Sequence, residues 1–239
     1  MADRVPGHQD VGRRQFLQTV LSGAVVGAAA QAGVELTFPQ RLHAQPNFSP
    51  DAALHELLKG NQRFAANRLT SIEQDLIVLK EHTVEKQEPF AAVLACADSR
   101  VPVELVFDQT IGHIFVTRVA GNVVTPEIIA TLEYGVVVLG VKVLLVVGHG
   151  NCGAVKAAMK AASVPGQISV LYQHLQPAIE QSGGNVDKAI EANVRFQADL
   201  LRTSSTVIRD AVKTGKLKVE AGLYDLSTGS VSLVKPPRS

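Results

Sequence analysis

Tryptophan is absent from this sequence, and phenylalanine and tyrosine bring the aromatic share to only 5%. Because 46% of the residues are nonetheless hydrophobic, the core must be built mainly from valine, leucine, isoleucine and alanine. A surplus of charge is also missing, since 23 basic residues stand against 22 acidic ones and the formal net charge is +1. Nucleic-acid binding calls for a basic excess or a basic face, so that class of function is not indicated.

Cysteine is nearly absent as well. The two cysteines lie in CADSR (96–100) and GHGNCGAV (148–155), and each of these stretches ends a run of apolar residues. The chain can therefore form at most one internal disulfide. Internal repeats and low-complexity tracts are missing too, and 239 residues suit one ordinary domain with appendages.

The N-terminus has a composition of its own. Arg13 and Arg14 precede an uncharged stretch rich in alanine and glycine at 19–34. This order predicts a bacterial twin-arginine signal peptide, with small residues for cleavage near 30–32 or after Ala44. A short uncleaved membrane anchor is the alternative, although the apolar run is shorter than the roughly 20 residues of a good span. We expect 1–44 to be signal peptide and linker, 45–239 to be the folded domain, and the protein to be periplasmic or otherwise exported.

Beyond residue 44, segments with apolar residues at helical spacing alternate with short apolar runs typical of strands. Ser49 and Pro50 predict the start of a helix that ends before residue 68. A continuous apolar run predicts a strand covered on both faces at 90–96. Two further strands are predicted at 113–121 and 141–150. Further helices are expected at 71–86, 126–140, 153–162 and, with a break at Gly183 and Gly184, over 167–213; a final hairpin is expected at 216–226 and 230–235.

This alternation predicts an α/β fold with a mostly parallel central β-sheet of four to five strands flanked by helices. In open parallel sheets, binding sites form beyond the carboxyl ends of the strands. Cys96 ends the first strand, whereas His149 and Cys152 follow the third. If those two strands are neighbours, the three side chains point into one crevice.

Two thiolates and one imidazole suit zinc, and three protein ligands leave the fourth position open, as in catalytic zinc sites. A Cys96–Cys152 disulfide is the competing interpretation for an exported protein. A disulfide, however, has no use for His149, Asp98 or Arg100. The arginine is placed to pair with Asp98, keep it ionised and orient it beside the metal.

These residues resemble the β-class carbonic anhydrases. The resemblance covers roughly 50–235, and four segments carry it, namely CADSRVP (96–102), FDQTIGHIFVTRVAGN (107–122), LEYG (132–135) and GHGNCGAV (148–155). It implies one Zn²⁺ per subunit and the reversible hydration of CO₂ to bicarbonate and a proton, by attack of a zinc-bound hydroxide. Membership would make the protein a lyase with an N-terminal helical arm beside its sheet.

Carried over by position, the resemblance makes Cys96, His149 and Cys152 the zinc ligands. It makes Asp98 and Arg100 the catalytic pair, and it assigns three substrate-binding residues, Gln87, Gly153 and Tyr134. Val93 stands where some members have a tryptophan that accompanies an inactive form with the aspartate on zinc. We therefore expect Asp98 to stay off the metal at neutral pH.

The resemblance also implies a homodimer or a higher homo-oligomer, with residues 50–85 reaching over a partner and Gln87 close to the partner's zinc. Other functions stay open at this point. Relatives with the same ligands hydrolyse carbon disulfide, and an exported protein with a disulfide or a structural zinc needs no activity at all. A catalytically dead metal-binding homologue is disfavoured because Asp98, Arg100 and Gln87 are all present.

Overall fold

The computed structural model describes residues 48–71 and 83–235. The predicted signal peptide lies outside these ranges, as does most of the helix predicted at 71–86, and the described part of that segment, 83–86, is not helical. Within the described ranges, no helix is both long and apolar enough to span a membrane.

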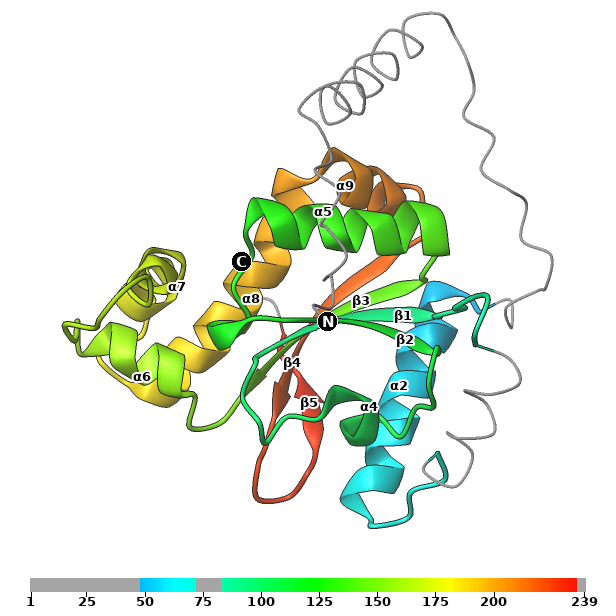
Figure 1. The fold of residues 1–239 in the computed structure, drawn as a ribbon, viewed down its shortest axis with the longest axis horizontal. Coiled ribbons are helices and arrows are strands. Elements are labelled where there is room, and N and C mark those ends of the chain that lie inside the picture. The colour runs from blue at the N-terminus through cyan, green and yellow to red at the C-terminus, as the bar shows by residue number, and fades with distance from the viewer. Residues whose placement is uncertain (1–47, 72–82, 236–239) are drawn as a thin grey trace, which may run out of the picture. The chain divides into compact units, whose positions relative to one another are not determined.

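A five-stranded sheet forms the centre of the molecule, and the predicted α/β architecture is confirmed (Figure 1). Its order is β2-β1-β3-β4-β5; the first four strands run parallel, and the last pairs antiparallel with β4. β1 and β3 are direct neighbours, which is the condition on which the predicted crevice depends. The strand bounds are β1 Ala91–Ala95, β2 Ile114–Arg118, β3 Val143–His149, β4 Lys218–Tyr224 and β5 Val231–Leu233.

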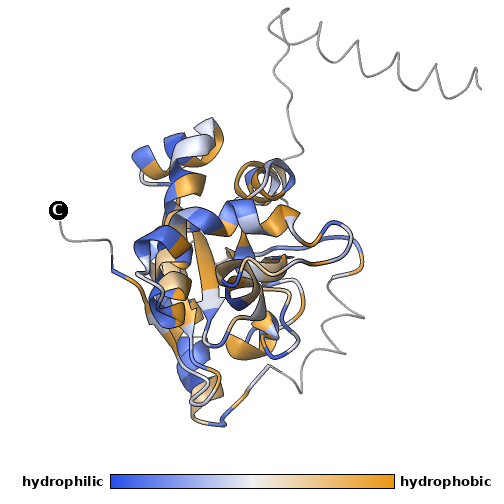
Figure 2. Cartoon of the chain, turned by 90° about the vertical axis from the view of Figure 1, so that its left-hand side faces the viewer, coloured by the Kyte–Doolittle hydropathy of each residue, from blue (hydrophilic) through white to orange (hydrophobic). Residues whose placement is uncertain are grey.

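Alternate residues of the central strands pack into two separate cores. Val93 and Leu145 face one side, where they join Leu57 of α2 (Pro50–Ala65). Leu94 and Leu144 face the other side and join helices α5 (Pro126–Tyr134), α8 (Val186–Ser204) and α9 (Thr206–Lys213) (Figure 1). Because both faces are covered, every residue of β1 and β3 is buried. Figure 2 shows the hydrophobic strands inside and hydrophilic residues on the outer helices.

Helix α2 begins where the sequence predicts, since the hydroxyl of Ser49 accepts a hydrogen bond from the Ala52 amide at 3.2 Å. Gly60 allows the helix to lie directly against the backbone after α4 (Val103–Val106). A Cβ atom at this position would lie 1.8 Å from the carbonyl oxygen of Phe107. Any larger residue would push α2 away from the core.

The remaining helices follow the predicted order with shorter bounds. Gly183 and Gly184 separate α7 from α8 as expected, and both have positive φ. The helix predicted at 126–140 is α5 followed by a π-helical turn, η3. The bounds are α5 Pro126–Tyr134, η3 Gly135–Leu139, α6 Gly153–Met159, α7 Val170–Gln181, α8 Val186–Ser204 and α9 Thr206–Lys213.

The strand predicted at 113–121 is too long, because β2 ends at Arg118. The chain then turns through the short helix η2 (Ala120–Asn122), where Gly121 and Asn122 have φ of 75° and 45°. Positive φ at two successive residues ends the extended conformation. This turn lies beside the predicted ligands at the carboxyl ends of the strands.

Candidate active site

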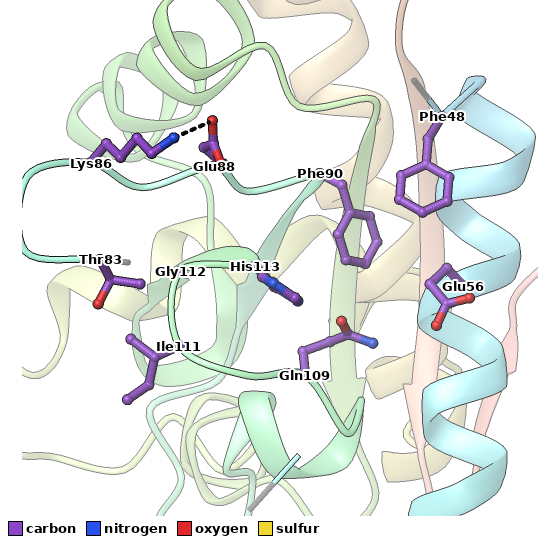
Figure 3. A pocket seen from close by; sticks show the side chains of 10 residues that line it. All are labelled: Phe48, Glu56, Thr83, Lys86, Glu88, Phe90, Gln109, Ile111, Gly112 and His113. Carbon is purple, nitrogen blue, oxygen red and sulfur yellow. Dashed lines mark hydrogen bonds and ion pairs between the residues drawn. The ribbon is translucent and has the colours of Figure 1, made fainter. Parts of the chain in front are cut away.

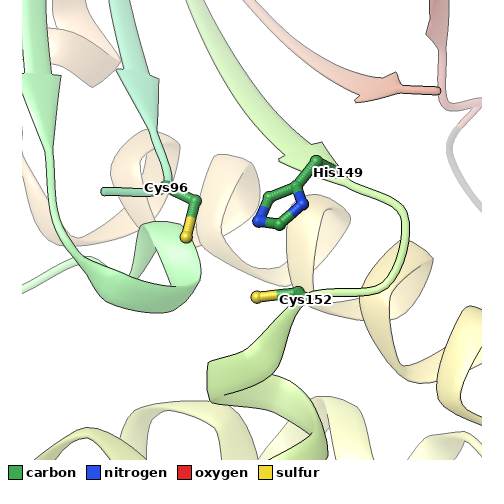
Figure 4. Close-up of side chains that lie close together, drawn as sticks. All are labelled: Cys96, His149 and Cys152. Carbon is green, nitrogen blue, oxygen red and sulfur yellow. The ribbon is translucent and has the colours of Figure 1, made fainter. Parts of the chain in front are cut away.

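The structure brings Cys96, His149 and Cys152 together, as the sequence predicts (Figure 4). Cys96 directly follows β1, His149 is the last residue of β3, and Cys152 caps α6. One ligand atom from each residue lies within 4.8 Å of the other two, and all three side chains are buried. The ligand atoms of a tetrahedral zinc site, with bonds of about 2.3 Å to sulfur and 2.0–2.1 Å to nitrogen, lie roughly 3.5–4 Å apart. The three ligand atoms therefore lie close enough to converge on one zinc ion.

The histidine is oriented as a metal ligand requires. His149 Nδ1 lies 2.9 Å from the Gly150 carbonyl oxygen, so it carries the hydrogen and donates it. The amide of Gly150 in turn donates to the Tyr224 carbonyl at 3.0 Å, which fixes this loop to β4. His149 Nε2 is left buried without a hydrogen-bond partner. A buried acceptor without a partner is unfavourable, and a metal ion in the cluster would satisfy it.

The two thiols are free and differ in acidity. The Cys152 thiol and the Gly121 amide lower the pKa of Cys96 to about 4 against the effect of burial. The hydrogen bond to Cys96 and burial raise the pKa of Cys152. Zinc binds thiolates, so metal binding at this pair would displace the thiol protons.

Asp98 and Arg100 form a close ion pair at the edge of the cluster. Arg100 Nη2 lies 2.8 Å from Asp98 Oδ2, which is itself 3.8 Å from His149 Nε2. Hydrogen bonds from the Arg100 side chain hold the pKa of Asp98 well below its usual range, although burial opposes them. Asp98 is thus an ionised carboxylate held next to a ligand atom. Whether it stays off bound zinc remains a prediction.

Gly153 lies with these residues, but Gln87 and Tyr134 of the same chain do not. Gly153 is the first residue of α6, directly after Cys152. Gln87 is exposed and precedes β1, so the five residues of that strand, about 16 Å, separate it from Cys96. Tyr134 packs on Phe115, at the amino end of β2, with ring centroids 6.2 Å apart. Both side chains therefore lie at the opposite edge of the sheet from the cluster.

A separate cavity of about 420 Å³ also lies at that opposite edge (Figure 3). Phe90 and His113, which precede β1 and β2, line it together with Phe48, whose ring centroid is 5.3 Å from that of Phe90. An ion pair between Lys86 and Glu88 borders it. None of the clustered thiol or imidazole ligands reaches this cavity, so the chemistry belongs to the carboxyl edge.

Sequence reasoning missed two residues, Arg118 and Gly121, whose hydrogen bonds hold the cluster. Arg118 donates from Nε to the Cys96 carbonyl at 3.0 Å and from Nη2 to the Asp98 carbonyl at 2.6 Å. The Gly121 amide donates to Cys96 Sγ at 3.3 Å. Both residues lie within the segment predicted as a plain strand. The glycine followed by asparagine was the available signal for a turn there.

Comparison with known proteins agrees with this geometry. Residues 91–231 match the model of the carbonic anhydrase family. A carbonic anhydrase from Mycolicibacterium smegmatis is 35% identical over 79% of this chain and 95% of the relative. The Coccomyxa β-carbonic anhydrase in complex with acetazolamide is 28% identical, with a TM-score of 0.59 over 76% of this chain and 86% of that one. A β-carbonic anhydrase from Sordaria macrospora, described as tetrameric, shares the fold at 23% identity, with a TM-score of 0.61 over 78% of this chain and 98% of that one.

Proposed function

The chain belongs to the β class of the carbonic anhydrase family, and from that premise we propose how its own residues interconvert carbon dioxide and bicarbonate. The observation that carries the proposal is the arrangement of one ionised carboxylate beside a buried cluster of two sulfurs and one imidazole nitrogen. Cys96, His149 and Cys152 would hold the zinc ion. When bound, zinc lowers the pKa of a coordinated water, a property for which carbonic anhydrases are the standard example.

Asp98 is the base in this proposal. Its Oδ2 atom lies on the side of His149 Nε2 and accepts the proton of the attacking water, while Arg100 keeps the carboxylate ionised and fixed. A positioned base orients the lone pair of the nucleophile toward the carbon as well as taking its proton. Release of bicarbonate and transfer of the proton to solvent complete the cycle.

Gln87 and Tyr134 act on the site of a partner chain in this proposal. Both side chains are exposed and lie at the edge of the sheet away from their own cluster. A homo-oligomer that places this edge over the neighbouring cluster would bring an amide donor to the developing bicarbonate oxygen. Gly153, where an added Cβ atom would meet no atom within 4 Å, would line the same side of the site.

The test uses two substrates on one zinc-loaded preparation. Stopped-flow hydration of carbon dioxide is followed with a pH indicator, and carbon disulfide hydrolysis is followed by release of hydrogen sulfide. Fast hydration with slow or no hydrolysis supports the proposal. Hydrolysis of carbon disulfide as the dominant activity would assign the same site to that alternative substrate.

We also propose that the protein is exported by the twin-arginine route, because Arg13 and Arg14 precede an uncharged alanine- and glycine-rich stretch. Residues 1–47 are fused to a reporter that is active only after folded export, and the double substitution Arg13→Lys and Arg14→Lys serves as the matched control. Export of the first fusion and retention of the second is expected. Equal distribution of both fusions would overturn the proposal.

A further inference from the structure

The turn that donates a hydrogen bond to Cys96 is held by two amide side chains from a distant helix. Asn193 and Gln197 lie one turn apart on α8, and their exposed fractions are 1% and 0%. Asn193 Nδ2 donates to the Gly121 carbonyl at 2.9 Å. The Val124 amide donates to Gln197 Oε1 at 2.8 Å. These contacts span more than 70 positions in the sequence, so the local sequence of the turn does not supply them.

We propose that Asn193 and Gln197 are positioning residues for the zinc site, acting through the Gly121 amide that donates to Cys96 Sγ. This inference rests on the proposed zinc function of the cluster. Residue Gly121 links both ends of the arrangement, since its amide donates to the sulfur at 3.3 Å and its carbonyl accepts from Asn193. The amide and the carbonyl lie in successive peptide groups that meet at the Gly121 Cα, so holding the carbonyl limits the φ and ψ rotations that would turn the amide away from the sulfur.

The conformation of the turn explains why it needs this support. Gly121 and Asn122 both have positive φ, a conformation that glycine and asparagine tolerate, but ordering a glycine in a single conformation has an entropic cost. A Cβ atom at Gly121 would lie 3.2 Å from the Leu175 side chain, so α7 packs directly over the turn. A buried backbone carbonyl without a partner is unfavourable, and Asn193 provides that partner. Without it, the turn would rearrange toward water or toward extended backbone.

The two amides also hold each other in place. Gln197 Nε2 donates to Asn193 Oδ1 at 3.0 Å and to the His174 carbonyl of α7 at 3.0 Å. One residue along α8, Val194 packs against Gly148, where a Cβ atom would lie only 2.3 Å from it. Helix α8 therefore contacts both β3, which ends in the ligand His149, and the turn whose Gly121 amide donates to the ligand Cys96. Its position sets the relative placement of these ligands.

Hydrogen bonds from a backbone amide to a coordinated thiolate belong to the outer shell of a metal site, and losing such contacts typically weakens metal binding about 10–100-fold. We expect a zinc affinity loss of that order for Asn193→Ala. Asn193→Asp keeps the oxygen that accepts from Gln197 but replaces the NH₂ group that donates to the Gly121 carbonyl with a second oxygen. A similar loss of zinc affinity is expected for this variant. Gln197→Met acts one step further from the sulfur, and a smaller loss is expected.

Asn61 offers a matched control, because it is an equally buried asparagine that bridges distant backbone elsewhere in the fold. Its Nδ2 donates to the carbonyls of Val106 and Gly229, and its Oδ1 accepts from Val231. Asn61→Ala should lower the melting temperature about as much as Asn193→Ala, yet leave zinc affinity unchanged. The comparison separates a loss of general stability from an effect on the metal site.

The experiment measures zinc affinity by chelator competition on the purified full-length variants, together with the thiolate-to-cobalt charge-transfer band after cobalt substitution. A 10–100-fold affinity loss and a shifted cobalt band for both Asn193 variants, with neither change for Asn61→Ala, is the expected result. Equal losses for Asn193→Ala and Asn61→Ala, or no loss for the folded Asn193→Asp, would overturn the inference. Zinc affinity is measured without any substrate. The inference about Asn193 can therefore fail or hold independently of whether the protein hydrates carbon dioxide.

Discussion

Both carboxylate oxygens of Asp98 accept hydrogen bonds from the Arg100 side chain, Oδ1 from Nε at 2.9 Å and Oδ2 from Nη2 at 2.8 Å. The Arg100 amide adds a third hydrogen bond to Oδ1 at 3.0 Å. Two parallel hydrogen bonds between a guanidinium and a carboxylate fix orientation as well as charge. The carboxylate next to His149 is therefore held in one direction before any substrate arrives.

This geometry predicts that Arg100→Lys lowers kcat although the positive charge is kept. An ammonium group cannot form the paired hydrogen bonds of a guanidinium, so Asp98 loses its fixed orientation. A decrease of about 10–100-fold is expected, with zinc content unchanged. Arg209→Lys is the control, because Arg209 forms only an exposed ion pair with Asp210. Wild-type kcat in Arg100→Lys would show that the paired geometry is not needed.

Metal removal distinguishes the zinc site from the disulfide alternative. We expect a chelator to abolish hydration activity and added zinc to restore it. After removal under anaerobic conditions, a thiol reagent should titrate Cys96 and Cys152, the two cysteines of the chain. A protein that retains its activity in the presence of chelator, or that yields no thiols when denatured, would contradict the assignment.

Mixing two inactive variants tests whether Gln87 acts in a partner's site. Gln87→Ala damages the donor and Asp98→Ala damages the base. In a mixed oligomer, one site keeps its own Asp98 and receives an intact Gln87 from its neighbour. In such a pair the other site lacks both residues, so one site of the two is active. After dissociation and reassembly, we therefore expect each mixed pair to recover about half of the wild-type activity. If mixing yields only the average of the two variants, Gln87 does not act across chains.

Stability at low pH should depend on Asp108, whose side chain is fully buried. Its carboxylate accepts hydrogen bonds from Arg63, from Thr70 and from the Ser71 amide. Burial alone would raise the pKa of Asp108, but these donors outweigh it and hold the pKa well below its usual range. Ionised Asp108 thus stabilises the fold above its unfolded pKa of about 4, and this contribution is lost as pH falls further.

Asp108→Asn should therefore lower the free energy of unfolding at neutral pH by about 2–4 kcal/mol, because Arg63 loses its partner. The difference from wild type should shrink as pH falls below about 4. Urea unfolding at several pH values measures both effects. Asp210→Asn is the control, because Asp210 is exposed and its substitution should change the free energy of unfolding by less than about 0.5 kcal/mol. A difference that does not change with pH would assign the effect to packing instead of charge.

The sheet and the ligand cluster were predictable because they depend on local pattern and on one topological rule. Continuous apolar runs marked β1 and β3, and the carboxyl ends of adjacent parallel strands placed Cys96 near His149. The turn at Gly121 was not predictable in the same way. Its conformation depends on Asn193 and Gln197, which read in the sequence only as polar residues within a helix.

The substrate-side residues show a second limit of sequence reasoning. The resemblance placed Gln87 close to a partner's zinc but left open which copy supplies Tyr134, and the strand direction places both residues at the other edge of their own chain. A single sequence does not say which copy of a chain supplies a residue. That information depends on how exposed surfaces associate.

The most direct measurement is stopped-flow carbon dioxide hydration by the zinc-loaded protein without residues 1–44, beside Asp98→Ala with the same zinc content. Positioned acid–base groups contribute about 10²–10⁴-fold to rates, so we predict rapid hydration by the first protein and a loss of that size in the second. Equal hydration rates in the two proteins would contradict the role given to Asp98. Absence of activity in the folded, zinc-loaded wild type would contradict the function itself.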